Sequence, residues 1–432
     1  MKRLLARLVR GEITRRDFAR QMARYGFGAI TAESILDAGA YGADLPKRSE
    51  DEFGFKPYTD RTFFEQWSGS EGVPIHTGYH LEDVRALDLK DWKRLGVRGA
   101  IIDLQGAEGT DVAYEIELAP GQSTRPMRGM FEESLFVLDG QGETTVWHQR
   151  NHTQTFKWAK RSLFSPPLNV WRVHKNTGQT PAKLISFNDL PVVMDLFHNV
   201  DFVFNNGFEF RDRYNEERDF FVMNPAKFEG IGSAGTFGAD EREQVRLVET
   251  GLVPDVNGLD MYDSKARGFS NRSVEICLAN NTMQTHLSQF DVGTYKRAHR
   301  HGPGSHVLSL EGVGYTLFWT ENSKYSEGRQ HMRAEWKDGT LFVPPDRWFH
   351  QHFNTGGDAA KYMATEWIGT KYWSKAIGGG GRTHRLNTVS VRDGGNMVDE
   401  LDEDPAVRSM FEEELKKHGV PSRMPALKKS AR

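Results

Sequence analysis

The chain has 432 residues, of which 38% are hydrophobic and 27% charged, a composition typical of folded proteins with two or three domains. Its net charge of −3 shows no basic excess of the kind that indicates a nucleic-acid-binding protein. The sequence also contains no apolar run of 18 residues, which a membrane-spanning helix would need. We therefore expect a small-molecule substrate, with no nucleic-acid or membrane partner. Cys277 is the single cysteine, which excludes intrachain disulfides and favours a reducing, cytoplasmic location.

The N-terminal segment has the pattern of a helix. Apolar side chains recur at helical spacing among charged residues over residues 1–40. Arg15 and Arg16 resemble the twin-arginine export pattern, but charged residues such as Arg20 and Glu33 interrupt the apolar stretch that an export signal requires. Export therefore stays a minor alternative to the cytoplasm.

Strand patterns dominate the rest of the chain. Short apolar or alternating runs, such as residues 113–118, begin near Gly99 and are separated by turns, as in an antiparallel barrel or sandwich. A second strand-rich stretch covers residues 274–373. Between the two stretches we expect a short helix over 190–197 and a connecting strand over 202–204. Asp404-Pro405 has the signature of a helix start, and Gly419 marks its end.

The two strand-rich stretches are an internal repeat. Residues 166–178 match residues 344–356 without a gap, sharing Pro-Pro, His, Asn, Thr and Gly at the same offsets. Asp139-Gly140 similarly matches Glu311-Gly312, which indicates duplication of one barrel. The predicted organisation is an N-terminal helical arm and mixed extension (1–95), a first barrel (96–200), a connection (201–272), a second barrel (273–376) and a C-terminal tail with one helix (377–432).

Histidines of the second repeat have the spacing of a metal site. His299 and His301 are two residues apart, so on a strand both side chains face one side, and His350 approaches from a facing strand. Neutral imidazoles favour Fe, Ni, Cu, Zn or Mn over Mg or Ca. His306 is a candidate fourth ligand when counted from His301, but counting back from the following glycine places Ser305 there instead. The alternative is a pair of surface histidines in a basic turn.

These motifs resemble the two signature motifs of the cupin superfamily. The residues that carry the resemblance are Gly293-x5-His299-x-His301-x4-His306, followed by Gly312, and Gly339-x5-Pro345-x-Arg347-x2-His350-x3-Asn354. The chain departs from the family where His306 or Ser305 replaces a glutamate and where Arg347 replaces a glycine. The resemblance implies a mainly β protein with two tandem cupin barrels (double-stranded β-helix or jelly roll) and helical N- and C-terminal extensions.

The first repeat lacks the metal motif. Aligning its turn at Gly140 with Gly312 places Met127 and Gly129 at the positions of His299 and His301, while the position of His350 falls on Arg172. Glu133 or Ser134 falls at the carboxylate position. A single carboxylate does not hold a transition metal, so this barrel is predicted to be structural.

Within the cupins, the second repeat is similar to gentisate 1,2-dioxygenase and 1-hydroxy-2-naphthoate dioxygenase. The shared residues are His-Arg-His at 299–301, Glu311-Gly312 and His-x-His-x-Asn at 350–354. Those enzymes cleave rings with O₂ at a three-histidine Fe(II) site, usually in the first barrel. The resemblance implies a metal-dependent oxygenase with one divalent transition metal per chain, Fe(II) before Mn, Ni, Cu or Zn. Its substrate would be a small hydroxylated acid, aromatic or not. The alternatives are a non-catalytic metal-binding cupin and a cupin isomerase, decarboxylase or lyase.

Further residues complete the hypothetical site. His352 should face the same interior as His350, as a catalytic acid or base or as a hydrogen-bonded core residue. The N-terminal arm and the C-terminal helix suit contacts with other copies of the chain, so we expect a homo-oligomer. Core packing is the alternative role for the two tryptophans and solvation for the two arginines among the candidate substrate contacts, which are Gln289, Arg297, Trp319, Arg347 and Trp348.

Overall fold

The chain divides into two compact units, residues 1–60 and 61–432, and every element below belongs to the second unit. The helix expected over residues 1–40 lies outside the described residues, except at four positions in residues 13–18. Among the described residues, no helix is both long enough and apolar enough to cross a membrane. The computed structural model describes residues 13–14, 17–18, 61–107, 109–148, 152–223, 247–264, 267–302, 304–367, 389–399 and 401–426.

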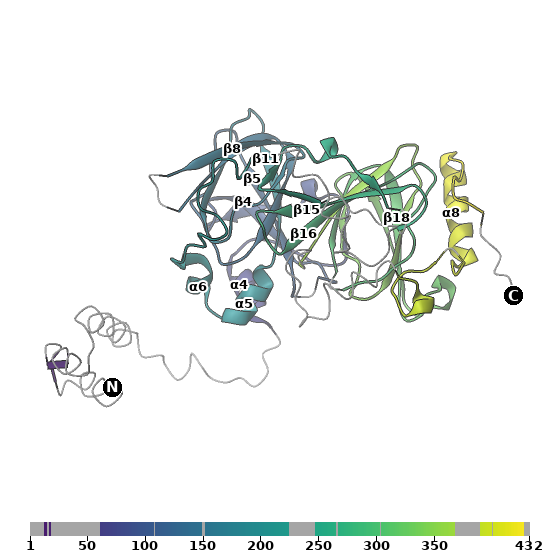
Figure 1. Ribbon diagram of the computed structural model, residues 1–432, viewed down its shortest axis with the longest axis horizontal. Helices are drawn as coiled ribbons and strands as arrows, with labels where there is room; N and C mark the ends of the chain where they lie inside the picture. The colour runs from purple at the N-terminus through teal and green to yellow at the C-terminus, as the bar shows by residue number, and fades with distance from the viewer. Residues whose placement is uncertain are drawn as a thin grey trace. The chain divides into compact units, whose positions relative to one another are not determined.

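The first barrel is built from a larger and a smaller sheet (Figure 1). The larger sheet has the order β1-β4-β5-β11-β6-β9-β13 with β3 beside β4, and the smaller has the order β10-β7-β8. Its strands are β1 (Ile75–His76), β3 (Lys90–Trp92), β4 (Val97–Ile102), β5 (Val112–Leu118), β6 (Glu133–Asp139), β7 (Gln141–Trp147), β8 (Gln154–Ala159), β9 (Leu163–Phe164), β10 (Trp171–Asn176) and β11 (Ala182–Asn188).

The second barrel repeats this arrangement. Its larger sheet has the order β12-β15-β16-β22-β17-β20-β2 with β14 beside β15, and its smaller sheet has the order β19-β18-β21. Its strands are β12 (Leu247–Thr250), β14 (Tyr262–Asp263), β15 (Asn271–Leu278), β16 (Met283–Phe290), β17 (His306–Glu311), β18 (Val313–Trp319), β19 (His331–Lys337), β20 (Leu341–Phe342), β21 (Phe349–Asn354) and β22 (Ala360–Trp367).

Both barrels have jelly-roll connectivity. The strands β5-β11-β6-β9 face β10-β7-β8, just as β16-β22-β17-β20 face β21-β18-β19. Isolated bridges at Met127 and His299 add a fourth segment to the smaller sheet of each barrel. This is the double-sheet arrangement of cupins, and it confirms the predicted fold class of two tandem barrels.

The barrels exchange short edge strands. β2 (His80–Leu81) lies between β1 and β3 of the first barrel in the chain but pairs with β20 of the second, and β13 (Leu252–Val253) pairs with β9 of the first. One-turn 3-10 helices follow these strands at 84–86 and 256–258, each capped by an aspartate, Asp83 or Asp255. The exchange covers edges that would otherwise expose unpaired backbone groups. β2 lies before the expected start of the first barrel at residue 96, and β13 lies before the expected start of the second at residue 273. Each of these strands nevertheless pairs with a strand of the other barrel.

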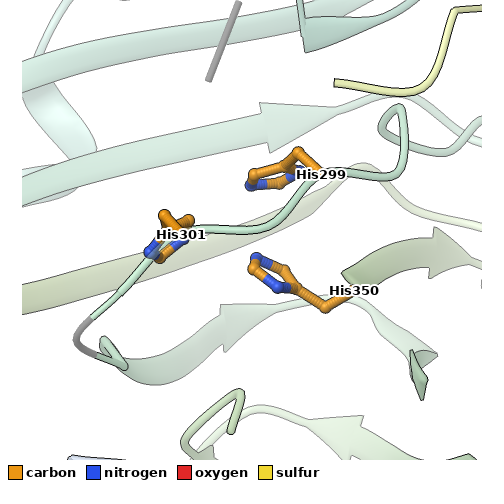
Figure 2. Close-up of side chains that lie close together, drawn as sticks. All are labelled: His299, His301 and His350. Atoms are coloured by element: carbon orange, nitrogen blue, oxygen red, sulfur yellow. The ribbon is translucent and has the colours of Figure 1, made fainter. Parts of the chain in front are cut away.

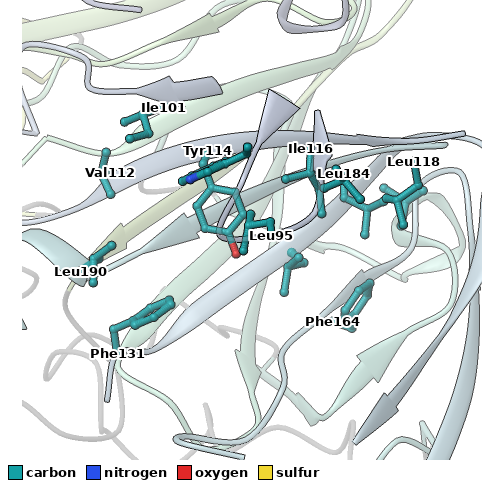
Figure 3. Close-up of a cluster of buried hydrophobic side chains, with 14 of the residues drawn as sticks. Leu95, Ile101, Val112, Tyr114, Ile116, Leu118, Phe131, Phe164, Leu184 and Leu190 are labelled. Atoms are coloured by element: carbon teal, nitrogen blue, oxygen red, sulfur yellow. The ribbon is translucent and has the colours of Figure 1, made fainter. Parts of the chain in front are cut away.

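Two apolar clusters follow from this arrangement. One fills the first barrel and includes Tyr114, Ile116 and Phe164 (Figure 3). The other contains side chains from both barrels, among them Phe187 and Met363. Because the barrels share this second cluster and exchange strands, we expect them to unfold together.

Helices cover the barrels. α5 (Leu190–Phe197) forms where a short helix is expected. The strand expected over 202–204 is instead part of α6 (Val200–Asn205), whose first turn is capped by the Asn199 side chain. α4 (Phe63–Ser70) precedes the first barrel with a capping box of Thr62 and Glu65.

α8 (Pro405–His418) confirms the predicted C-terminal helix. Asp404 caps its start, and Gly419 ends it with a φ of 66°. Its apolar side chains Phe411 and Leu415 pack against Tyr295 and Phe353 of the second barrel. Short 3-10 turns at 325–327 and 391–393 complete the elements around it.

A histidine–threonine pair recurs in both barrels. Nδ1 of His174 lies 2.8 Å from Thr144 Oγ1, and Nδ1 of His352 lies 2.8 Å from Thr316 Oγ1. Both histidines are buried. Burial, and secondarily the charge of Arg172, lowers the pKa of His174 to about 3. The pair therefore belongs to the fold, since it is present where the metal motif is missing.

The depressed pKa of His174 predicts a pH-dependent stability. A histidine buried in its neutral form stabilises the fold above its unfolded pKa of about 6.5 and loses that contribution as pH falls below it. We expect His174 to remove up to about 1.4 kcal/mol of unfolding free energy per pH unit between about pH 6 and pH 4. Denaturant unfolding of wild type and His174→Gln should show a flatter pH dependence for the variant. An exposed control, His152→Gln, should match wild type, and parallel curves for His174→Gln would contradict the assignment.

Candidate metal centre

Three histidines of the second barrel come together as predicted from their spacing (Figure 2). His299 and His301 lie between β16 and β17, and His350 lies on β21. Each of the three offers a ligand atom within 4.8 Å of the others. The backbone fixes this approach, because His299 and His350 exchange N–H···O hydrogen bonds of 3.1 and 2.8 Å. One ion could therefore contact all three imidazoles.

Hydrogen bonds set the tautomer of two of these histidines. Nδ1 of His299 lies 3.1 Å from the carbonyl of Arg297, and Nδ1 of His350 lies 3.2 Å from the carbonyl of Trp348. A carbonyl only accepts, so each Nδ1 carries the proton and each Nε2 keeps its lone pair.

The electrostatics keep these imidazoles neutral. Burial, followed by the neighbouring His350, holds the pKa of His299 well below its usual value. Burial, followed by His301, does the same for the pKa of His350. Metal ligation requires the neutral form, so neither His299 nor His350 has to release a proton to bind an ion near neutral pH. The donor set fits a divalent transition metal.

His306 is not brought to this cluster. It begins β17, where successive side chains face opposite sides, and its Nδ1 lies 2.8 Å from Asp111 Oδ2 of the first barrel. Its ring also contacts Phe187 in the core shared by the two barrels. Ser305, one residue earlier, lines the histidine pocket and donates a hydrogen bond of 2.6 Å to Glu366. Of the two positions left open by the sequence, Ser305 is the one that faces the site.

His352 lines the same pocket but is held by the fold. Its ring lies 5.5 Å from that of His350, and its Nδ1 is engaged by Thr316. Burial first, then the neighbouring His350, holds its pKa well below the usual value. These contacts suit a neutral side chain that forms one wall of the pocket. Because His174 makes the same hydrogen bond in the first barrel, we favour a hydrogen-bonded core role for His352 over a catalytic acid or base.

The pocket is polar and small. Its empty space is about 450 Å³ including the open mouth. Beside the histidines discussed above, the lining has two cationic side chains, two carboxylates, a tyrosine and one further histidine. These additional groups, which the sequence analysis did not single out, are Arg267, Lys296, Glu275, Glu366, Tyr362 and His286.

Lys296 is the most unusual of these groups. It is buried, and its ammonium donates to Ser288 Oγ at 3.1 Å and to the Tyr362 hydroxyl. The ammonium also lies 4.9 Å from the Tyr362 ring centroid. Burial raises the pKa of Tyr362 to about 12, so its hydroxyl stays protonated at neutral pH. A fixed cation and a hydroxyl thus stand beside the candidate metal ligands.

None of the five expected substrate contacts lines this pocket. Gln289 faces the other side of β16, because its neighbours His286 and Ser288 are the residues directed toward the pocket. Arg347 is exposed, with its guanidinium 3.9 Å from Asp346. Trp348 packs against the apolar cluster around Phe290.

Arg297 and Trp319 line a different pocket, which lies beside α8. Arg297 is 3.9 Å from Asp399. Trp319 stacks on Phe349 and donates its indole N–H to the carbonyl of Asn322. For Trp319, core packing is therefore the role that the contacts support.

The first barrel has an ion pair where the second has histidines. Met127 forms a bridge with Arg172, just as His299 does with His350. The Arg172 guanidinium contacts Glu133, and both side chains are buried. Tyr114 and Ser186 also donate hydrogen bonds to Glu133, at 2.6 and 2.8 Å. Across the described residues, the histidine cluster of the second barrel is the only potential metal-binding group of this kind.

Comparisons with known proteins give weak similarity only. No protein-family model matches the chain, and no curated protein matches its sequence. Among solved structures, a mutant of oxalate decarboxylase from Bacillus subtilis aligns with a TM-score of 0.44 and 10% identity, covering 68% of this chain and 78% of that chain. The formate complex of oxalate decarboxylase from Lactobacillus farciminis aligns with a TM-score of 0.43 and 10% identity, covering 68% and 87%. Similarity at this level carries no assignment of activity.

Two histidine variants test the composition of the centre. We expect His301→Ala to lower the affinity for Fe(II) or Mn(II) by at least about tenfold, because it removes a ligand. His306→Asn should keep the wild-type affinity, since the amide can still donate to Asp111 away from the cluster. Metal content per chain after anaerobic reconstitution measures both. Loss of metal in His306→Asn, with the fold intact, would restore His306 as a ligand.

Proposed function

We propose that this protein is a metal-dependent enzyme whose second barrel binds one divalent transition metal through His299, His301 and His350. The observation that carries the proposal is a pocket that brings together the buried His299 and His350, the partly buried His301 and the buried Lys296. A purely structural metal site is usually closed by four protein ligands, whereas this cluster offers three and adjoins a pocket. The open side is where a substrate would bind.

The lining favours a small acid as substrate. Lys296 and Arg267 can hold a carboxylate, and the Tyr362 hydroxyl can donate a further hydrogen bond. Trp319 and Trp348, which would have formed an aromatic wall, lie elsewhere. We therefore propose that the substrate is a compact hydroxy or dicarboxylic acid that chelates the ion, and not an aromatic acid.

For the chemistry, we propose oxidation of the bound acid by O₂. Three neutral nitrogen ligands leave an octahedral ion with three further positions, enough for a chelating acid and O₂. When bound, Fe(II) or a related ion would supply Lewis acidity and a meeting point for the two reactants. Lys296 would orient the acid, and the neutral wall formed by His352 would limit water around it. A cytoplasmic location and assembly into a homo-oligomer stay predictions.

A non-oxidative reaction, such as decarboxylation, is the second candidate. The observation that favours it is the set of proton-transferring groups in the pocket, because Lys296, Tyr362 and Glu366 lie among its lining. Such groups could deliver a proton to the carbon that loses CO₂. A non-catalytic metal-binding protein is the third reading, and it predicts no turnover of any acid.

Oxygen consumption distinguishes these candidates. We expect the Fe(II)-loaded protein to consume O₂ with one member of a panel of small hydroxy and dicarboxylic acids, and His301→Ala to consume none with the same acid. CO₂ release without net O₂ uptake would replace the oxygenase by the non-oxidative enzyme. Stoichiometric metal without turnover of any acid would favour the non-catalytic reading.

Lys296→Met tests the acid-binding role. Methionine keeps the length and apolar packing of the lysine stem but removes the charge. A hydrogen bond to a charged group is worth about 1.5–3 kcal/mol, so we expect the dissociation constant of the best-bound acid to rise by about 10- to 100-fold. Arg297→Gln, which alters a cation outside the pocket, should leave that constant unchanged. Calorimetric titration of the metal-loaded proteins gives both values, and equal affinities in Lys296→Met and wild type would exclude this role.

A further inference from the structure

A carboxylate stands behind one of the three histidines, outside the histidine motif. Glu366 lies on β22, is buried and lines the pocket. Its Oε2 accepts the 2.6 Å hydrogen bond from Ser305 Oγ and lies 3.8 Å from Nδ1 of His301. Glu366 is not a member of the cluster formed by the three imidazoles, so it lies beside His301 rather than among the ligand atoms.

In the other two histidines, an acceptor at Nδ1 fixes which ring nitrogen is available to the metal ion. His299 and His350 each direct Nδ1 to a backbone carbonyl, which leaves Nε2 for an ion. Nδ1 of His301 instead lies near the carboxylate of Glu366. The 3.8 Å separation is longer than a hydrogen bond, so the role proposed below requires the ring to turn toward the carboxylate. An anionic acceptor makes the imidazole a stronger ligand than a neutral carbonyl does.

The repeat supports a dedicated role for this carboxylate. In the first barrel, Glu133 on β6 pairs in register with Asn188 on β11. By the same register, Ser305 and Glu366 occupy these two places in the second barrel, where His306 pairs with Thr365. The carboxylate has thus changed strands between the repeats. In the first barrel it neutralises Arg172, whereas in the second it lies beside His301.

We propose that Glu366, anchored by Ser305, is a positioning residue that holds Nδ1 of His301 and directs its Nε2 to the metal ion. This inference rests on the proposed metal centre. It assigns to Ser305, at the place where the cupin motif has a glutamate, the task of fixing a carboxylate supplied by the neighbouring strand. The carboxylate also adds negative charge next to a centre whose protein ligands are neutral.

Titration of the metal-free full-length protein with Co(II), followed by visible absorption, tests the proposal. We expect Glu366→Gln to weaken Co(II) binding by about 10- to 100-fold while the absorption bands keep their positions, because the ligand set is unchanged. Ser305→Ala should also weaken Co(II) binding, but by a smaller factor than Glu366→Gln does. The double variant should be no weaker than Glu366→Gln alone, since Ser305 acts through Glu366. Glu335→Gln, which changes an exposed carboxylate on β19 outside the pocket, should bind as wild type does.

The remaining outcomes separate this inference from the metal centre itself. Wild-type affinity in Glu366→Gln would remove the role of Glu366 and leave the centre standing. Displaced Co(II) bands in Glu366→Gln would make the carboxylate a direct ligand and overturn its positioning role. Absence of stoichiometric Co(II) binding by the folded wild-type protein would overturn the proposed centre. Circular dichroism of the metal-free variants verifies that each is folded, and Ser305→Ala retains the test if Glu366→Gln is not.

Discussion

The pairing of the His299 segment with β21 is the constraint on which the candidate site depends. Two backbone hydrogen bonds join His299 to His350, and they place side chains from distant parts of the chain on one face of the smaller sheet. Because side chains alternate along a strand, that register also directs His352 inward and Phe353 outward against α8. A shift of one residue would exchange the pocket lining with the surface that packs on the helix.

The duplicated barrel shows that the scaffold does not require the histidine cluster. Hydrogen-bonded histidine–threonine pairs at His174 and His352 are equivalent, so the strand framework is the same in both halves. At the centre of that framework, the first barrel has a buried Arg172–Glu133 pair. A buried ion pair compensates its own desolvation only with good hydrogen bonding, which the Tyr114 hydroxyl helps to provide. The same position in the second barrel has imidazoles, whose neutral form is stable in a buried place.

The sequence predicted the features that depend on local pattern. The two barrels, their duplication, the C-terminal helix and the approach of His299, His301 and His350 all follow from periodicity and motif spacing. It failed where the facing of a side chain depends on the exact path of an irregular segment. The turn between His301 and β17 decides between Ser305 and His306, and counting residues cannot fix its shape.

Similar reasons explain the other differences. Gln289 is a candidate substrate contact by sequence, but β16 directs its neighbour Ser288 toward the pocket and Gln289 to the opposite side. Lys296 reads in sequence as part of a basic turn, whereas the fold buries it against Tyr362. Glu366 is far from the motif in sequence and reaches His301 only because β22 lies beside β17. Segment 202–204 has the aromatic composition of a strand, but the Asn199 cap starts a helix there.

The charges of the pocket would link binding of the proposed metal ion to binding of the proposed acid. Two cationic side chains, Lys296 and Arg267, share it with two carboxylates, Glu275 and Glu366. A divalent ion held by neutral imidazoles adds positive charge to this balanced set, in a buried place where water screens it weakly. An acid that chelates the ion supplies the missing negative charge. Each ligand should therefore raise the affinity for the other, and by thermodynamic linkage the two factors must be equal. Lys296 would then do more than orient the acid. Its positive charge leaves the metal-bound pocket with a net positive charge that only the acid neutralises.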